Sequence, residues 1–218
     1  MLEILRKLEE KVYPSHTALI VVDMQNDFCA KGGVLDREGH DLSRIQSMTP
    51  RLIKFIDKAR ETRIPVIHVQ MIFGLKNKWY ISDVGFEQHA RMSSKRFIQY
   101  SICEQDSWGA DFFEGFEPLL GEFLVRKHRY SAFVGTDLDL ILKSRGIRTL
   151  IMTGISTNVC VESTARDGFM RDYYIVLVKD CTAASSEEDY NCTLRNITRF
   201  FGEVVDSSDV LKCWESSN

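Results

Sequence analysis

The sequence of 218 residues has no excess of basic side chains. Lys and Arg total 28, Asp and Glu total 31, and the formal net charge is −3 with a pI near 6.0. No broad basic stripe runs along the chain. Because binding to nucleic acid depends on concentrated positive charge, this balance argues against a nucleic-acid-binding protein.

Long hydrophobic runs are also missing. The longest, such as ALIVV and LIMTGI, are far shorter than the roughly 20 apolar residues that cross a bilayer. The first residues, MLEILRKLEEKVYP, place charges among Leu and Val at helical spacing, which predicts a short amphipathic helix rather than a signal peptide. We therefore expect a cytoplasmic protein without membrane contacts.

Neither disulfide nor zinc patterns occur among the cysteines. The six cysteines are scattered without CxxC spacing, which in a cytosolic chain indicates free thiols. There is no internal repeat, low-complexity tract or linker, and an apolar content of 44% is sufficient for one full core. The sequence thus predicts one domain over residues 1–218.

What the sequence does contain is a regular alternation of apolar strands and amphipathic helices. This order predicts an α/β fold of three layers, α-β-α, with a mostly parallel central sheet. Residues 74–118, rich in aromatic and charged side chains, are either an insertion or lid, or an ordinary surface excursion. Strands are expected over 16–23, 64–70, 122–127, 148–154, 174–180 and 203–205, and helices over 43–61, 136–146, from about 159, and 186–201.

Three chemically active side chains fall at or just after the carboxyl ends of predicted strands. Asp23 and Lys127 end their strands, and Cys160 follows the strand that ends near residue 154. In an open parallel sheet, ligands bind beyond these strand ends. The carboxylate, the ammonium group and the thiol are therefore expected to converge if their strands lie close together.

Cys160 is expected in the first turn of a helix. Ser156, Thr157 and Asn158 are all suitable N-cap residues, so the helix is predicted to begin within two residues of Val159. The exposed N–H groups and dipole of a helix start stabilise anions, which predicts a thiol pKa below the usual value of about 8.5. A buried structural cysteine is the alternative interpretation.

Three motifs carry a resemblance to a known family. VVDMQNDF at 21–28, RKHRYSAFVGTDLD at 126–139 and TGISTNVCVESTARDGF at 153–169 resemble the isochorismatase-like cysteine hydrolases, over residues 16–210. The resemblance is strongest to ureide amidohydrolases of the biuret hydrolase and ureidoacrylate amidohydrolase type. It implies a catalytic triad of Asp23, Lys127 and Cys160. It also implies a cis peptide bond between Ile155 and Ser156, and an oxyanion hole made by the backbone N–H groups of Ser156 and Cys160.

The activity that this resemblance implies is hydrolysis of a C–N bond in a small ureide or N-carbamoyl compound. Cys160 would form a thioester acyl-enzyme and release ammonia or an amine, without an organic cofactor. The resemblance also implies a homo-oligomer, either dimer or tetramer. Two alternatives remain: another small-amide hydrolase, nicotinamidase-like in chemistry, or a noncatalytic small-molecule-binding protein with the same fold.

No metal is expected in the site. Nicotinamidases carry an Asp and His metal cluster after the second strand, where this sequence reads HVQMIFGLKNKW and lacks the cluster. His68 lies within a predicted strand and is interpreted as a structural histidine.

Four residues are candidates for substrate contacts: Asn26, Phe28, Gln70 and Tyr130. Asn26 has an alternative role in capping a turn, and Phe28 has one in the core. Tyr130 follows Lys127 on a loop and is predicted either to cover the pocket or to bond the backbone. Gln70 lies where ureidoacrylate-type enzymes place other polar and aromatic residues.

Overall fold

The chain forms a parallel sheet of six strands in the order β3-β2-β1-β4-β5-β6, and every neighbouring pair is parallel. This topology confirms the predicted α/β class and parallel sheet. The computed structural model describes residues 4–74, 80, 82–91 and 101–216. The strands are β1 (Thr17–Val22), β2 (Val66–Met71), β3 (Phe123–Lys127), β4 (Thr149–Ile155), β5 (Tyr174–Ala183) and β6 (Glu203–Val205).

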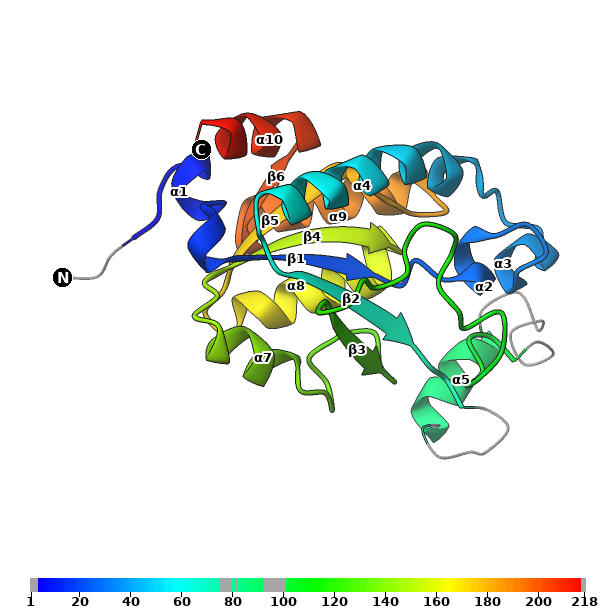
Figure 1. Cartoon of the computed structure of the whole chain (residues 1–218). Helices are drawn as coiled ribbons and strands as arrows, with labels where there is room; N and C mark the ends of the chain where they lie inside the picture. The colour runs from blue at the N-terminus through cyan, green and yellow to red at the C-terminus, as the bar shows by residue number, and fades with distance from the viewer. Residues whose placement is uncertain (1–3, 75–79, 81, 92–100, 217–218) are drawn as a thin grey trace.

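Helices cover both faces of this sheet (Figure 1). On one face lie α4 (Ser43–Glu61) and α10 (Ser207–Glu215). On the other lie α7 (Leu138–Ser144), the π-helical turn η2 (Thr157–Val161) with α8 (Glu162–Phe169), and α9 (Glu187–Asn196) with η3 (Ile197–Phe201). Short elements complete the described chain: α1 (Leu8–Lys11), η1 (Pro14–His16), α2 (Asn26–Cys29), α3 (Val34–Arg37) and α5 (Asp83–Arg91).

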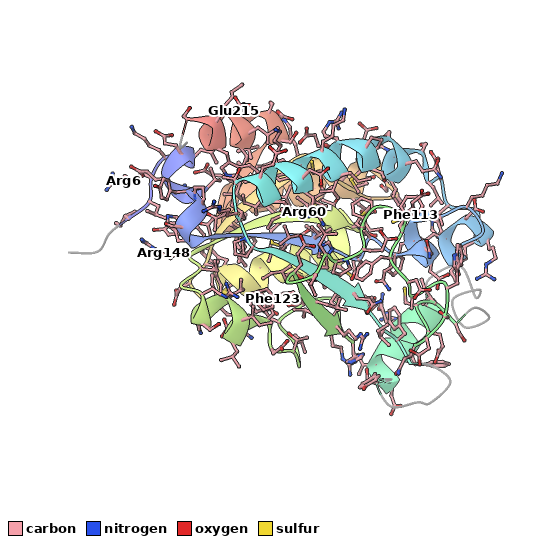
Figure 2. All side chains as sticks on the ribbon, in the orientation of Figure 1. Arg6, Arg60, Phe113, Phe123, Arg148 and Glu215 are labelled. Carbon is pink, nitrogen blue, oxygen red and sulfur yellow. The ribbon has the colours of Figure 1, made fainter. Side chains whose placement is uncertain are left out.

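The apolar runs of the sequence become strands because both faces of the sheet are covered. In β1, Ile20 packs into the core on the α7 and α8 face, whereas Leu19 and Val21 pack into the core under α4. All six residues of β1 are buried. Side chains fill the space between the sheet and both helical layers (Figure 2). A strand buried on both faces reads as a continuous apolar run, which is the pattern seen in the sequence.

Several element boundaries differ from the sequence-based expectation. The helix over 43–61 is confirmed, but α7 begins at Leu138 and not at Thr136, which instead accepts the N–H of Leu138 at 3.2 Å.

The last helix, α10, was not predicted. It is held by Trp214, whose indole N–H donates to the carbonyl of Val12 at 3.0 Å. This contact spans the chain, so local periodicity alone gives little sign of it.

The predicted insertion over 74–118 falls partly outside the described residues, at 75–79, 81 and 92–100. Its second half, 101–118, packs against the body of the protein. Ile102 and Phe116 are fully buried, and Phe112 forms an antiparallel bridge with Gln25, just after β1. This half therefore forms part of the wall at the carboxyl ends of the strands.

One glycine sets how closely β1 and β4 approach at that edge. Gly154 pairs with Val22 and has a φ of +96°, a conformation that side-chain-bearing residues rarely adopt. A Cβ at this position would lie 2.1 Å from the carbonyl oxygen of Val22. Only glycine lets the end of β4 lie beside the end of β1 without displacing it.

We predict that Gly154→Ala lowers the free energy of unfolding by at least about 3 kcal/mol, because backbone strain and a backbone clash add. Denaturant unfolding measures the change. Gly146→Ala is the matched control, since Gly146 also has a positive φ, of +65°, but open space around its Cβ position. The free energy of unfolding of Gly146→Ala should fall by only about 1 kcal/mol. Equal losses for the two variants would contradict the argument from close approach.

Candidate active site

The three strand-end residues converge at the carboxyl edge of the sheet. Asp23 follows β1, Lys127 ends β3, and Cys160 lies in η2 after β4. The Nζ of Lys127 lies 2.8 Å from Oδ2 of Asp23 and 3.3 Å from Sγ of Cys160. Because β2 separates β3 from β1, the long lysine side chain reaches past one strand to make these contacts. All three side chains are buried.

A tight turn after β1 aims the carboxylate of Asp23. Asp23 has a φ of +52°, in the left-handed region that Asp tolerates better than most residues. Its N–H donates to Val69 on β2 at 3.0 Å, and its carbonyl accepts the N–H of Gln25 at 2.8 Å. The backbone of this residue is therefore fixed by the neighbouring strand and by its own turn.

The helix carrying Cys160 starts as predicted. Ser156 is its N-cap, and the Ile155–Ser156 peptide bond is cis, as the family resemblance implies. The carbonyl of Ser156 accepts the N–H groups of both Val159 and Val161, at 3.1 and 3.2 Å. The bond from Val161, five residues on, makes this turn wider than an α-helical turn, and Cys160 lies within it.

The expectation of a low thiol pKa is wrong. Burial raises the pKa of the Cys160 thiol to about 12; the nearby charge of Lys127 opposes this rise, and the charge of Asp23 adds to it. A helix start favours a thiolate, but burial of the sulfur and the neighbouring Asp23 carboxylate outweigh that effect. The thiol is therefore protonated at neutral pH.

The charges in the site are held by Lys127 and Asp23. Burial alone would lower the pKa of Lys127, but the charge of the adjacent Asp23 carboxylate outweighs burial and leaves the pKa raised. Burial raises the pKa of Asp23, and Lys127 opposes that rise. With a charged lysine at 2.8 Å, the resting site holds an ion pair beside a neutral thiol that also interacts with Asp23.

Gln70 points away from the three converging residues. Its amide donates to the carbonyl of Ala110 at 2.9 Å and its oxygen accepts from Nε of Arg126 at 3.1 Å. The next residue, Met71, faces the other way, with Sδ 3.9 Å from Nζ of Lys127. Gln70 instead lines a polar cavity of about 240 Å³ together with His128. The structure thus does not bring Gln70 together with the triad positions.

Tyr130 lies on the loop that follows β3 and is exposed. The part of its side chain that is buried raises the pKa of its phenol. Phe28 is half-buried and packs against the cores on both sides of the sheet. Asn26 starts α2, and its amide donates to the carbonyl of Trp108 at 2.8 Å, so one of its donors holds the wall segment 101–118.

Two buried polar residues in this region escaped the sequence analysis. The Gln25 amide donates to the carbonyls of Met71 and Ala110, at 3.0 and 2.8 Å. The Asp27 carboxylate accepts the N–H of Cys103 at 2.7 Å. Both tie the turn after Asp23 to segment 101–118. The sequence pattern that could have indicated them is the cluster of polar residues within the otherwise apolar motif VVDMQNDF.

His68 has the structural role that the sequence predicted. It is buried on β2, its Nε2 lies 2.9 Å from Oε2 of Glu122, and its ring meets Phe112 edge to face. Over the described residues, no group of three or more His, Cys, Asp or Glu side chains is placed to hold a metal ion. Within the same residues, no helix is long and apolar enough to cross a membrane.

The larger cavity lies elsewhere, at the edge where the strands begin, marked by Arg148 in Figure 2. It has a volume of about 900 Å³ and is lined by basic side chains in or just after the last turn of a helix, such as Lys143, Arg171 and Arg199. Cations at helix C-termini are favoured by the helix dipole, which accounts for this charge without a ligand. None of the three converging residues lines it.

Comparison with known proteins gives one consistent family. The family model described as the isochorismatase domain matches residues 17–209. The chain is 35% identical to ureidoacrylate amidohydrolase RutB of Acinetobacter baylyi, covering 93% of this chain and 85% of that protein. The protein of the same name from an Enterobacter species is 38% identical, covering 90% and 88%.

Solved structures agree with this match. A cysteine hydrolase from Pseudomonas syringae pv. phaseolicola has a TM-score of 0.84 at 28% identity, covering 100% of both chains. N-carbamoylsarcosine amidase from Thermoplasma acidophilum has a TM-score of 0.67 at 26% identity, covering 88% of this chain and 96% of that one.

We predict that Lys127→Met destabilises the protein at pH 7 by about 3 kcal/mol, because it leaves the Asp23 carboxylate buried without a counter-charge. Adding Asp23→Asn should recover most of the loss, and denaturant unfolding measures both. Lys143→Met is the control: Lys143 also pairs with a carboxylate, that of Asp139 at 2.8 Å, but is largely exposed. It should change stability by less than about 1 kcal/mol. A Lys127→Met loss no larger than the control would contradict a buried ion pair.

We further predict that Asp23→Asn makes Cys160 easier to alkylate. Removing the negative charge that raises the thiol pKa, while Lys127 stays, should increase the iodoacetamide rate at pH 8 about 10-fold. Wild-type Cys160 should keep gaining reactivity above pH 10, since its pKa is about 12. Peptide mass spectrometry reports each site, and half-buried Cys192 serves as the internal control. An unchanged or slower rate at Cys160 would refute the assigned protonation state.

Proposed function

The chain belongs to the isochorismatase family, and on that premise we propose that it is a cysteine amidohydrolase that cleaves a C–N bond of a small ureide or N-carbamoyl compound. The catalytic group is a triad of Asp23, Lys127 and Cys160. The observation that carries this proposal is the placement of Lys127, whose ammonium group contacts both the carboxylate and the sulfur.

In the first step Cys160 attacks the substrate carbonyl. The Asp23 carboxylate takes the thiol proton as the sulfur–carbon bond forms, because a thiol with a pKa near 12 needs a base to become a nucleophile. Lys127 stays charged and stabilises the negative charge that develops on the sulfur. In this proposal the backbone N–H groups of Ser156 and Cys160, at the helix start, receive the oxyanion.

The second half of the reaction returns the site to its resting form. Asp23 gives its proton to the leaving nitrogen, the C–N bond breaks, and ammonia or an amine departs from the acyl-enzyme. Water then adds to the acyl carbon, with Asp23 accepting its proton, and the sulfur–carbon bond breaks as the proton returns to Cys160. The net reaction consumes one water and needs neither metal nor organic cofactor.

A ureide substrate is favoured by the relatives. The curated relatives at 35–38% identity are named as ureidoacrylate amidohydrolases, and a structural neighbour is an N-carbamoylsarcosine amidase. Both names describe substrates with a carbamoyl nitrogen. In this proposal Tyr130, Phe28 and Asn26 would contact the substrate, as the sequence predicts. Gln70, already bonded to Arg126, would act at most on a distal part of the substrate.

We also propose a domain organisation, an oligomeric state and a location for the protein. Residues 1–218 act as one domain, and the enzyme works as a homodimer or tetramer, as the family resemblance implies. A cytoplasmic location fits the cysteines, since all six are free thiols.

Two other functions would use the same fold. A nicotinamidase-like hydrolase would act on an aromatic amide, and its support is the shared fold with a Bacillus subtilis nicotinamidase at 22% identity. A noncatalytic small-molecule-binding protein would not need a lysine placed against a thiol, so the geometry favours an enzyme.

Activity should appear as ammonia release from a panel of biuret, ureidoacrylate, N-carbamoyl amino acids and nicotinamide, measured with a chelator present. We expect turnover of a ureide or N-carbamoyl compound, and at least about 10³-fold lower turnover by Cys160→Ala, which removes the nucleophile. Cys213→Ala, far along the chain on α10, is the matched control and should leave turnover unchanged.

Each contrary result has a distinct meaning. Release from nicotinamide alone would favour the second function, and no release from any compound would favour a binding protein. Wild-type turnover by a folded Cys160→Ala variant would overturn the cysteine mechanism.

A further inference from the structure

The hydroxyl group of Thr164 joins two parts of the site that are far apart in the chain. Thr164 lies on α8, one turn after Cys160, and is fully buried. Its Oγ1 donates to the carbonyl oxygen of Cys160 at 2.7 Å. The same Oγ1 accepts the N–H of Ala132 at 3.0 Å. The Thr164 hydroxyl therefore donates one hydrogen bond to the residue of the proposed nucleophile and accepts another from a different loop.

The first of these bonds alone would carry little meaning. Thr and Ser in helices commonly donate to the carbonyl four residues earlier. The second bond is different, because Ala132 lies beyond β3 and is itself fully buried. Its N–H is away from water and needs a protein partner, and Thr164 supplies it.

The loop that Ala132 belongs to carries active-site groups at its start. It leaves β3 at Lys127, whose Nζ lies 3.3 Å from Sγ of Cys160, and passes through Tyr130, which the proposed function assigns to substrate contact. Ala132 is only two residues beyond Tyr130. A fixed backbone at Ala132 thus limits how far Tyr130 can move relative to Cys160.

We propose that Thr164 is a positioning residue, whose hydroxyl holds the Cys160 turn and the Tyr130 loop at one fixed separation so that the substrate lies against the sulfur. This inference rests on the proposed function, since it assigns Thr164 to the same reaction. Thr164 does not touch the reacting atoms. It acts through Cys160 and Ala132.

Replacing the hydroxyl by a methyl group of similar size isolates this role. Thr164→Val keeps the shape of the side chain but leaves the buried Ala132 N–H without its acceptor and the Cys160 carbonyl without its hydroxyl donor. The loop must then move to find another acceptor. Thr164→Ser keeps the hydroxyl and restores both bonds.

The test combines steady-state kinetics on the ureide that the wild type hydrolyses with iodoacetamide alkylation of Cys160. For Thr164→Val we expect kcat to fall at least about 10-fold, because small misplacements of reacting groups have large effects on rate, while KM changes less than about 3-fold. Alkylation of the buried thiol should become about 5-fold faster as its turn loosens. Thr164→Ser should stay within about 3-fold of wild type in both assays.

Thr17→Val is the matched control. Thr17 is also fully buried and its hydroxyl bonds the carbonyl of Tyr13 at 2.8 Å, but it starts β1 at the opposite edge of the sheet. It should lower stability without changing kcat or alkylation. Equal effects of Thr17→Val and Thr164→Val would reduce Thr164 to a general contributor to stability and overturn the inference.

Other outcomes remain informative. Wild-type kcat and alkylation in Thr164→Val would refute the coupling. If that variant fails to fold, Thr164→Ala replaces it against the Thr164→Ser partner, with the same expectations. If the wild type hydrolyses no ureide, the proposed function fails, yet the alkylation rates still decide whether Thr164 holds the Cys160 turn.

Discussion

The buried ion pair between Lys127 and Asp23 is the interaction on which the rest of the site depends. Two buried charges are unfavourable unless they lie close together, and these lie 2.8 Å apart. That distance requires β1 and β3, which are not neighbours, to end at the same height on the sheet. The parallel register of β1, β2 and β3 satisfies this requirement. The close approach at Gly154 then brings the end of β4, and with it Cys160, to the same point.

This arrangement implies a particular way of activating a thiol. A helix start and a lysine both favour a thiolate, but burial and the Asp23 carboxylate outweigh them. At rest the proton therefore stays on the sulfur, with the Asp23 carboxylate beside it. In the proposed mechanism this keeps the nucleophile neutral until a substrate carbonyl is in place, and it lets Asp23 carry the proton that the leaving nitrogen needs.

Much of the fold and the position of the triad follow from the sequence. Apolar runs predicted the strands because both faces are covered, and the strand-end rule drew Asp23, Lys127 and Cys160 together. The thiol pKa was not predictable, because it depends on burial and on a neighbour 137 positions away in the chain. That Gln70 bonds Ala110 and Arg126 rather than meeting Lys127 was not predictable either, because its side-chain direction depends on strand register. The Trp214 contact and the Thr164 bridge join distant segments, so no local pattern marks them.

Thiolate absorbance near 240 nm reports the protonation state of Cys160 directly. The quantity to measure is the difference between wild type and Cys160→Ala as pH rises. We expect no step up to about pH 10 and a rise only as the pH approaches about 12, the pKa to which burial raises the thiol. A step near pH 7 or below would show a preformed thiolate and refute a neutral resting thiol.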